Sequence, residues 1–559
     1  MSDQNDIIFG IDLGTTYSCI AHVDEYGKAV VTTNREGQLT TPSVVLFDGE
    51  NRVVGDEAKN TAILSPDQVV AMVKRQMGEP DWRFHYDGRD YTAEEISSYI
   101  LRKLAGDTEE KLNMPVKDVV ITCPAYFGIK EREATARAGM IAGFNVREVI
   151  NEPTAAAITY GLQNEQDQVV VVYDLGGGTF DVTVIEIKGG TITVIATGGD
   201  DHLGGRDWDQ AIVNYAVQQW KDATGSYEEP TDSPETLQDL WLKAEKAKQA
   251  LTSRAETRIA VVHNGPPVSV TLTRQKFDEL TEDLLNRTMM YMRFTMDEAQ
   301  EKQAGQINQI LLVGGSTKMP QVAERLEREF GIPYKIFEPD EAVAKGAAMY
   351  GQKLLIDEKI RDNIGTRIGA DAEDVDITEI APTVIQQAEE EVASDMGLKL
   401  TSVQKYHRTS VTNVASHSFG IIAIADSGTS RRREVISNLV LVNDALPASV
   451  ARRFYTEEDN QETVVLRIME NTEKTQRVEP ERFSSDAEIG NAVLDLPVRL
   501  PANSPIEVTF ELNQQGRLHV VGRDPRSGSE IEATIETRGG ISEEDLADAR
   551  SRATSITVS

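Results

Sequence analysis

The chain has 559 residues, of which 40% are hydrophobic and 6% aromatic, so it is too long for a single hydrophobic core and several domains are expected. Its net charge of −34 at pH 7 is spread along the chain, which disfavours nucleic acid and anionic membranes as partners. The first residues carry acids where a signal peptide needs Lys or Arg, and no apolar run approaches the ~18 residues of a membrane span, so we expect a soluble cytoplasmic protein.

The first predicted element is a β-hairpin within residues 7–23, IIFGIDLGTTYSCIAHV, in which Asp12, Gly14 and two threonines lie between strand-like runs. A glycine turn exposes consecutive backbone N–H groups, and threonine hydroxyls add donors suited to phosphate oxygens. Asp12 beside a phosphate would repel it unless a divalent cation lay between them. Taken alone, this hairpin is more typical of an ordinary turn.

Two cysteines, Cys19 and Cys123, each fall in a predicted strand and have no CxxC spacing. A disulfide framework or a zinc site is therefore disfavoured, and both are expected to be buried thiols.

The same hairpin arrangement recurs at residues 169–187, VVVVYDLGGGTFDVTVIEI, where three glycines lie between Asp174 and Asp181. A tight turn needs one or two glycines, since only glycine reaches positive φ without steric cost. The third glycine and the two acids therefore exceed what a turn requires. Two such hairpins predict two related half-domains that hold a magnesium-bound nucleotide.

A third glycine cluster, at residues 314–317, follows a predicted buried strand and precedes an amphipathic helix that begins near Pro320. It contains neither a P-loop nor a Rossmann GxGxxG pattern, so both common nucleotide folds are disfavoured. Further on, EPDEAVAKGAAMYG predicts a helix with Asp340 as its N-cap and small residues typical of close packing.

The second half of the chain is less regular. Residues 357–410 are acidic and predict a helix near 385–393, with a solvated insertion or linker as the favoured interpretation. Residues 504–536 alternate apolar and polar side chains, which predicts an antiparallel hairpin whose buried face carries Ile506, Val508, Phe510, Leu512, Leu518 and Val520. Near the end of the chain, Ser542 and Asp545 predict a capping box for a short helix.

Seven motifs resemble, in chain order, the signatures of the Hsp70 (DnaK) chaperone family: GIDLGTTYSC, INEPTAAAITYG, VYDLGGGTFDV, HLGGRDWD, AEKAKQALT, LLVGGSTKMP and PDEAVAKGAA. The resemblance implies an α/β fold, with an actin-like two-lobed ATPase domain followed by a β-sandwich peptide-binding-like domain. We expect the ATPase domain at 1–356, an atypical acidic insertion or linker at 357–411, the β-sandwich at 412–539 and a short helical stub of the family's lid at 540–559.

The resemblance also implies which residues would bind ATP or ADP. One lobe would hold the phosphates with Gly14, Thr15, Thr16 and Tyr17, and the other with Gly177, Gly178 and Thr179. The nucleoside would lie between Gly315, Ser316, Lys318 and Asp340 on one side and Glu245, Lys248 and Thr252 on the other. These last three share one helical face by their spacing, which a solvated charged face would also show. Gln249 replaces an Arg that some members place over the adenine ring.

For catalysis, the resemblance implies that Lys74 orients the attacking water and offsets charge on the transferred phosphoryl group, while Glu152 positions water or magnesium. Without the resemblance, the segment Asn151 to Pro153 is more typical of a simple helix start. Asp174, Thr179 and Asp181 complete the expected catalytic set, and Asp12, Asp174 and Asp181 would order water around Mg²⁺, with K⁺ as a second ion.

In the second half, the resemblance implies that Ile424, Val464 and Leu466 line a pocket for unfolded or extended polypeptides. The stretch RRFYTEEDNQETVVLRIMEN resembles a strand pair of the same β-sandwich. A nucleotide-exchange factor would be a further partner. The alternation by itself supports any β-sandwich.

Two departures from the family concern its control. The family's linker is apolar and followed by Asp, whereas TSVTNVASHSFG is polar and has Asn413 at that position. J-domain co-chaperones of the family also use an Arg before the Asn-Glu-Pro motif, where this chain has Glu148. We therefore expect weak or atypical stimulation by J-domain proteins, with residues 357–410 supplying the coupling between the halves.

Two other functions are alternatives on the sequence: a metabolite kinase built on the same actin-like core, and a nucleotide-sensing scaffold. A β-sandwich after residue 412 disfavours the kinase, and the presence of Asp12, Lys74 and Glu152 disfavours the scaffold.

Overall fold

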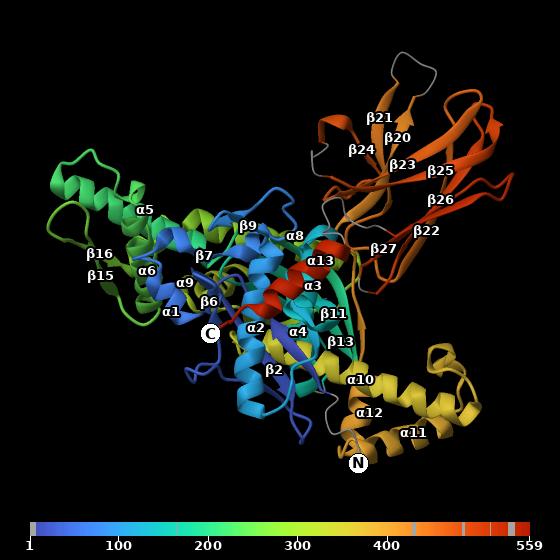
Figure 1. The fold of residues 1–559 in the computed structure, drawn as a ribbon, viewed down its shortest axis with the longest axis horizontal. Coiled ribbons are helices and arrows are strands. Elements are labelled where there is room, and N and C mark those ends of the chain that lie inside the picture. Colours follow the sequence, from blue (N-terminus) through green and yellow to red (C-terminus); the bar gives the residue numbers. More distant parts are fainter. Residues whose placement is uncertain (1–6, 165, 427–431, 483–486, 515, 535–542) are drawn as a thin grey trace.

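Two α/β lobes and a β-sandwich make up the protein, which the computed structural model describes over residues 7–164, 166–426, 432–482, 487–514, 516–534 and 543–559 (Figure 1). The predicted fold class is confirmed by this arrangement. Within the described ranges, no helix combines the length and the apolar character needed to cross a membrane.

Lobe I is built on a six-stranded sheet that mixes parallel and antiparallel pairs. Its strands lie in the order β11 (Asn145–Asn151), β10 (Asp118–Cys123), β1 (Ile8–Asp12), β2 (Tyr17–Val23) and β3 (Ala29–Thr32), with β4 (Thr41–Pro42) beside β2. The lobe also contains α1 (Asp56–Thr61), α2 (Ala93–Leu112), α3 (Ile129–Ala142), β5 (Val44–Asp48), β6 (Asn51–Val54), β7 (Val69–Ala71), β8 (Phe84–Tyr86) and β9 (Arg89–Tyr91). Cys19 and Cys123 are free and buried in this lobe, as expected.

Lobe II has a second six-stranded sheet, in the order β18 (Tyr334–Ile336), β17 (Ile307–Val313), β12 (Gln168–Leu175), β13 (Phe180–Lys188), β14 (Thr191–Asp200) and β19 (Ser410–Thr412). Its other elements are α5 (Gly205–Thr224), α6 (Pro234–Leu251), α7 (Arg274–Leu280), α8 (Glu282–Glu301), α9 (Pro320–Phe330), β15 (Glu256–Val261) and β16 (Val268–Thr273). The valine run of β12 reflects burial on both faces, because Val171 packs into one core and Val170 into another.

Both glycine hairpins are confirmed as antiparallel strand pairs. β1 pairs with β2 across the first turn, and β12 pairs with β13 across the second. The second register places Asp174 directly opposite Asp181, so the two carboxylates begin and end the same turn.

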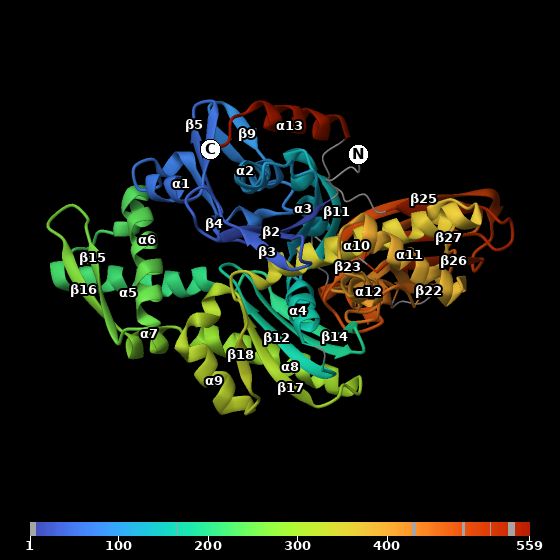
Figure 2. The ribbon, with the colours of Figure 1, turned by 90° about the horizontal axis from the view of Figure 1, so that it is seen from below.

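Two helices, α4 (Glu152–Gln163) and α10 (Ala342–Ile368), pack against each other, and α10 also packs on β1 and β2 (Figure 2). Glycine is required at their contact, since a Cβ on Gly346 would lie 1.8 Å from the Ala155 carbonyl oxygen. The prediction of Asp340 as N-cap was wrong: α10 begins at Ala342 without a side-chain cap. Asp340 forms an ion pair with Lys318 instead, so its carboxylate is engaged elsewhere.

The segment from 357 onward is helical and packed, so the expectation of a solvated linker was wrong. α10 continues to Ile368, and α11 (Pro382–Asp395) and α12 (Leu400–Arg408) fold back beside it (Figure 1). The helix expected near 385–393 is confirmed as α11. Ala388, Val403 and Tyr406 are buried in a core shared with α10. Glu390, Glu391 and Asp395 are exposed, whereas Glu389 is buried and accepts a hydrogen bond from Gln404 of α12.

The β-sandwich has a five-stranded sheet, β24 (Arg477–Val478), β21 (Arg433–Val440), β20 (Ser418–Ala425), β23 (Gln461–Asn471) and β25 (Glu488–Leu500). The second sheet contains β22 (Ala448–Tyr455), β26 (Pro505–Leu512), β27 (Leu518–Arg523) and β28 (Glu530–Thr534). The predicted hairpin of β26 and β27 is confirmed, and its apolar face is buried. The strand pair read from residues 452–471 was wrong, because β22 and β23 belong to different sheets.

The last helix, α13 (Glu543–Ser555), lies against α2 and α3 of lobe I (Figure 2). Ala549 and Ala553 are buried in the lobe I core, and Arg552 forms an ion pair with Glu95 of α2. Ser542 of the predicted capping box lies outside the described residues.

Candidate functional site

A large cleft of about 850 Å³ lies between the two lobes. It brings together most of the residues that the sequence predicted for nucleotide, metal and catalysis. Those that line it are Asp12, Gly14, Thr15, Thr16, Tyr17, Lys74, Glu152, Asp174, Gly177, Thr179, Glu245, Lys248, Thr252, Gly315, Ser316, Lys318 and Asp340. Seven parts of the chain that are far apart in the sequence, at residues 12–17, 74, 152, 174–179, 245–252, 315–318 and 340, therefore form one site.

Gly178 and Asp181 lie behind the cleft wall formed by the described residues. The Gly178 carbonyl oxygen accepts a hydrogen bond from Arg75 at 2.8 Å. Asp181 is buried, and its Oδ1 accepts the Tyr126 backbone N–H at 3.2 Å. Both hydrogen bonds hold the second hairpin in position from the side that faces away from the cleft.

The glycines of the second hairpin permit the two phosphate loops to meet. A Cβ on Gly177 would lie 2.1 Å from the Thr16 hydroxyl, and one on Gly178 would lie 2.4 Å from the Thr15 methyl carbon. Neither glycine has a positive φ. The sequence interpretation that such a turn needs glycine for positive φ was therefore wrong here, because close approach of the loops is the requirement.

Two carboxylates, those of Asp12 and Asp174, lie at the floor of the cleft, and that of Asp181 is buried behind them. Burial, with repulsion from Glu152, raises the pKa of Asp12 to about 7 and that of Asp181 to about 8. Burial and the same neighbour raise the pKa of Asp174 well above its ordinary range. Carboxylates held this close are stabilised by a cation.

The floor suits a hydrated Mg²⁺ better than a directly ligated metal. Across the described part of the chain, no three His, Cys, Asp or Glu side chains lie close enough to hold one metal ion. Mg²⁺ keeps several of its waters in proteins, and Asp12 and Asp174 are placed to accept hydrogen bonds from them. The donor set therefore fits the predicted role of ordering metal-bound water.

Lys74 and Glu152 form a buried ion pair, with Nζ 2.5 Å from Oε1. Lys74 lies in a short 3₁₀ helix of lobe I at Val73–Gln76, and Glu152 is the first residue of α4. Burial opposes the charge on Lys74, but the carboxylates of Glu152 and Asp12 outweigh it and raise its pKa. Glu152 begins a helix, as its local sequence predicts, and it also lines the cleft; its role in positioning water or magnesium stays a prediction.

A cross-lobe contact that the sequence did not reveal spans the cleft. The Tyr17 hydroxyl donates to Glu245 Oε1 at 2.8 Å, and Lys59 Nζ lies 2.5 Å from Glu245 Oε2. Lys59 also donates to the Tyr17 hydroxyl at 2.8 Å. Tyr17 and Lys59 belong to lobe I and Glu245 to lobe II, so this triad holds the lobes together.

Two of the residues predicted to hold the nucleoside are bonded to the start of α5 and to the second hairpin. Lys248 Nζ donates to the Gly205 carbonyl oxygen at 2.8 Å, and the Ser316 hydroxyl donates to the Gly176 carbonyl oxygen at 2.9 Å. Thr252 follows directly after α6, and Gln249 lines the cleft while remaining exposed.

Two further lining residues, Arg206 and Trp241, were missed by the sequence reasoning. Arg206 lies inside the quoted motif HLGGRDWD, but the motif gives no reason to single out its side chain. Trp241 stands four residues before Glu245, so the helical spacing that grouped the α6 residues would have found it one turn earlier.

The three residues predicted for the peptide pocket are not equivalent. Leu466 is only 2% exposed and packs in the core between the two sheets. Val464 is partly buried against the same core, and Ile424 is partly buried on β20. The described ladder between β20 and β23 ends at Ile421, so its register does not place Ile424 beside Val464.

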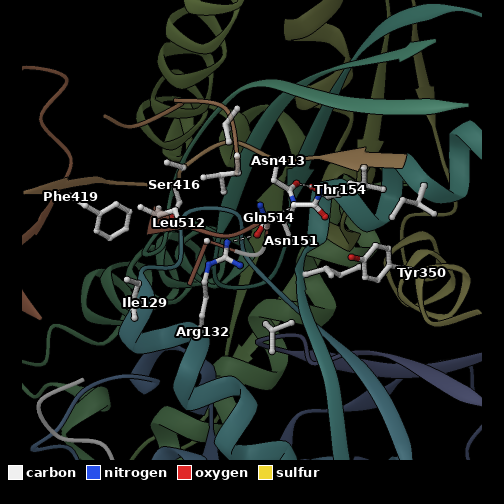
Figure 3. A pocket seen from close by; sticks show the side chains of 18 residues that line it. Ile129, Arg132, Asn151, Thr154, Tyr350, Asn413, Ser416, Phe419, Leu512 and Gln514 are labelled. Atoms are coloured by element: carbon white, nitrogen blue, oxygen red, sulfur yellow. Dashed lines mark hydrogen bonds between the residues drawn. The ribbon is translucent and has the colours of Figure 1, made fainter. Parts of the chain in front are cut away.

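A small cavity of about 30 Å³ lies where lobe I, the linker and the β-sandwich meet (Figure 3). Asn413 of the linker accepts the Thr154 hydroxyl at 3.2 Å and donates to the Gln514 carbonyl oxygen at 3.5 Å. Arg132 donates to the Asn151 side-chain oxygen in the same cavity. The linker therefore contacts both halves through polar groups.

Comparisons with known proteins agree with this architecture. The family profile described as "Hsp70 protein" matches residues 8–84 and 78–366. The chain is 36% identical over 547 residues to the "Chaperone protein DnaK" of Halobacterium salinarum, in strains R1 and NRC-1, covering 96% of this chain and 76% of each relative.

Proposed function

This chain belongs to the Hsp70 family, and on that premise we propose that it is an ATP-dependent chaperone whose nucleotide cleft controls the binding of extended apolar polypeptides. One observation carries the proposal: two phosphate-type loops, a carboxylate floor and a buried Lys–Glu pair converge in one cleft next to a β-sandwich. Nothing in the fold favours the metabolite kinase or the scaffold.

The cleft residues divide the work of hydrolysis. The backbone amides and threonine hydroxyls of the two hairpins would hold the phosphates, while Glu245, Lys248 and the 315–318 turn would hold the nucleoside. A bound Mg²⁺ would neutralise phosphate charge and carry ordered water, with K⁺ proposed near the same carboxylates. Asp12 and Asp174 line this floor and would accept hydrogen bonds from the metal-bound water, and Asp181 accepts the Tyr126 backbone N–H behind them.

Lys74 and Glu152 are placed to act on the attacking water. The Glu152 carboxylate can accept a hydrogen bond from the attacking water, which orients a lone pair of that water toward the phosphoryl group. The Lys74 ammonium offsets the negative charge that grows while the phosphoryl group is transferred. Thr179 adds one hydroxyl donor at the second hairpin. The pair holds each other in place, because Nζ and Oε1 are already in contact.

A continuous sheet connects the cleft to the β-sandwich. The hairpin strand β13 pairs with β14, and β14 pairs with the linker strand β19 in a parallel ladder from Thr191 and Ser410. Movement of the hairpin therefore reaches the linker through backbone hydrogen bonds. The predicted weakness of this docking rests on the polar linker side chains, of which Val411 alone among 409–412 is a large aliphatic.

We also propose that residues 357–410 supply the coupling. Tyr406 donates its hydroxyl to the Gly27 carbonyl oxygen of lobe I at 3.3 Å, and Lys405 donates to the Leu162 carbonyl oxygen at the end of α4. Since β19 begins two residues after α12 ends, a shift of this helix moves the linker strand directly.

Nucleotide turnover by the full chain, with and without an unstructured apolar peptide, tests the function. We expect magnesium-dependent ATP hydrolysis whose rate changes when peptide is added, and a peptide affinity that differs between ATP and ADP. The proposal would be contradicted if the chain hydrolysed no ATP. It would also be contradicted if peptide left the hydrolysis rate unchanged and the peptide affinity were the same in ATP and ADP. The cytoplasmic location stays a prediction.

A second measurement addresses control. A standard J-domain should stimulate single-turnover hydrolysis little, because Glu148 replaces a cationic contact. Tyr406→Phe and Lys405→Ala should reduce the peptide effect, with exposed Arg254→Gln as the control. Stimulation of about tenfold that neither variant alters would overturn the proposed coupling.

A further inference from the structure

Arg206 and Trp241 form a stacked pair on the lobe II wall of the cleft. Arg206 is the second residue of α5, and its backbone N–H donates to the Gly177 carbonyl oxygen at 2.8 Å, so its side chain starts beside the second phosphate loop. Its guanidinium carbon lies 2.8 Å from the centre of the Trp241 ring. Contact with the indole face holds the planar guanidinium in one orientation.

Trp241 extends the cleft-facing row of α6. Trp241, Glu245, Lys248 and Thr252 stand at positions i, i+4, i+7 and i+11, which place them on one helical face. All four line the cleft. The stack therefore belongs to the same wall as the predicted nucleoside contacts.

Arg206 differs from the other cations of the cleft because it has no anionic partner among the residues that the structure describes. The four lysines that line the cleft are each paired with a carboxylate: Lys59 with Glu245, Lys74 with Glu152, Lys248 with Asp209 and Lys318 with Asp340. Within the described part of the chain, no acceptor or carboxylate lies within bonding distance of the Arg206 guanidinium.

The nearby acids cannot serve it, since each is already engaged. The carboxylates that attract Arg206 are Asp209, Glu245 and Asp207, which pair with Lys248, Lys59 and Arg75 respectively. Burial lowers the pKa of Arg206 to about 10, which still leaves it charged at neutral pH. A partly buried, unpaired guanidinium is costly, and an anion entering the cleft would remove that cost.

We propose that Arg206, held by the indole of Trp241, is a nucleotide-binding residue that donates hydrogen bonds to the phosphate chain. Its planar fork suits phosphate oxygens, and its backbone already lies against the Gly177 loop. The inference rests on the proposed function, because it requires a nucleotide in this cleft. The indole acts as a positioning group and makes no contact with phosphate itself.

Equilibrium binding of MgADP and of adenosine to the full chain tests this assignment. Arg206→Gln should weaken MgADP binding about tenfold or more and adenosine binding by less than about twofold. Arg206→Lys, which keeps the charge but loses the fork, should fall between wild type and Arg206→Gln. Exposed Arg254→Gln is the matched control and should leave both affinities unchanged.

Trp241→Leu gives an independent readout. It should weaken MgADP binding about threefold, because the guanidinium loses its fixed orientation. Of the four tryptophans, Trp241 is the one that lines the described cleft, so MgADP should change the fluorescence of the wild type and not that of Trp241→Leu.

The outcomes separate this inference from the proposed function. Failure of the wild type to bind MgADP would overturn the proposed function, and the inference with it. Wild-type binding with an unchanged MgADP affinity in folded Arg206→Gln would overturn the inference alone. Equal losses for MgADP and adenosine would place Arg206 at the nucleoside and overturn the phosphate contact. A fluorescence change that persists in Trp241→Leu would remove the indole from the site.

Discussion

Site residues are easier to predict from the sequence in the nucleotide cleft than in the β-sandwich. In the cleft, charged and polar residues from seven parts of the chain converge, and ion pairs such as Lys59–Glu245 and Lys74–Glu152 join them. In the β-sandwich, three apolar residues predicted as one pocket include a core residue, Leu466, and two that are partly exposed. A buried Asp or Lys needs a specific reason to be there, whereas a strand leucine serves a core and a pocket equally well.

Lys74→Ala should separate chemistry from binding most sharply. We expect single-turnover ATP hydrolysis to fall by about 10²–10³-fold while ATP affinity changes little, because the ammonium is needed most where charge moves in the transition state. Rapid-mixing hydrolysis and calorimetric binding measure the two effects. Lys276→Ala, on the exposed face of α7, is the control. Equal losses of affinity and rate would remove the proposed role.

Leu466→Ala should show whether Leu466 stabilises the core of the β-sandwich or binds peptide. Truncating a leucine that is 2% exposed should lower the free energy of unfolding of the β-sandwich by roughly 2 kcal/mol or more. Val464→Ala, at a partly buried position on the same strand, should cost much less stability. Thermal unfolding and peptide affinity are measured together. A stable Leu466→Ala protein that loses only peptide binding would restore Leu466 to the pocket.

The triad of Tyr17, Lys59 and Glu245 should set how fast nucleotide leaves. Tyr17→Phe removes one cross-lobe hydrogen bond and should speed release of a fluorescent ADP about fivefold, and Lys59→Ala should do the same or more. Tyr26→Phe, on an exposed turn of lobe I, should release ADP at the wild-type rate. Unchanged release in both triad variants would show that this contact does not limit opening.

The sequence predicted the elements of the fold well where a segment had one clear pattern, such as an apolar run or a strict alternation of apolar and polar residues. The valine run and glycine turn at 169–187 gave both strands of the β12–β13 hairpin, and the alternation at 504–536 gave β26 and β27 with the correct buried face. Predictions were wrong where a distant partner decided the outcome. Asp340 has the residue type of an N-cap, but Lys318 engages its carboxylate. The 357–410 segment has a solvated composition, but one face of each helix packs on α10.

The candidate site shows the same division. Lys74 and Glu152 are 78 residues apart, so no local spacing could pair them, and only the family resemblance suggested both. Lys59 and Arg206 carry no local signal at all, because their role depends on what the fold brings opposite them. Trp241 could have been predicted from the sequence, since it lies four residues before Glu245 and therefore on the same face of the helix.

The junction between the two regions contains buried acids that should make their docking depend on pH. Glu470 of β23 accepts the Ile129 backbone N–H of α3 at 3.2 Å, and its Oε1 lies 3.4 Å from Nδ1 of His417. His417 also stacks near Tyr126, with ring centres 5.2 Å apart. Other charged groups that act on this cluster are Glu131, Lys130, Arg132, Glu133 and Asp201.

Burial raises the pKa of Glu470 to about 7, and burial with repulsion from Glu470 raises that of Glu131 to about 7, against an ordinary value of 4.5. Burial lowers the pKa of His417 from 6.5 to about 4. Docking of the two regions therefore takes up protons at the carboxyls of Glu470 and Glu131. Below pH 6.5, docking also releases a proton from His417. Above pH 6.5 only the carboxyls count, so docking should weaken as pH rises through 7 and be largely free of this dependence above 8.

Each carboxyl with a pKa of about 7 should change the docking equilibrium about fourfold between pH 6.5 and 8, and the two together on the order of tenfold. Dyes on Met140→Cys of α3 and Tyr455→Cys of β22, both exposed in the wild type, would report the separation of the two regions by energy transfer. Glu470→Gln should reduce the pH dependence, because it leaves an uncharged group at that position at every pH and only Glu131 still titrates near 7. Glu488→Gln on the neighbouring strand should keep the wild-type slope. Docking that strengthens with rising pH would mean that these carboxyls stay ionised at the junction and that their charge holds it together. A slope in Glu470→Gln as steep as that of the wild type would exclude Glu470 as a source of the pH dependence.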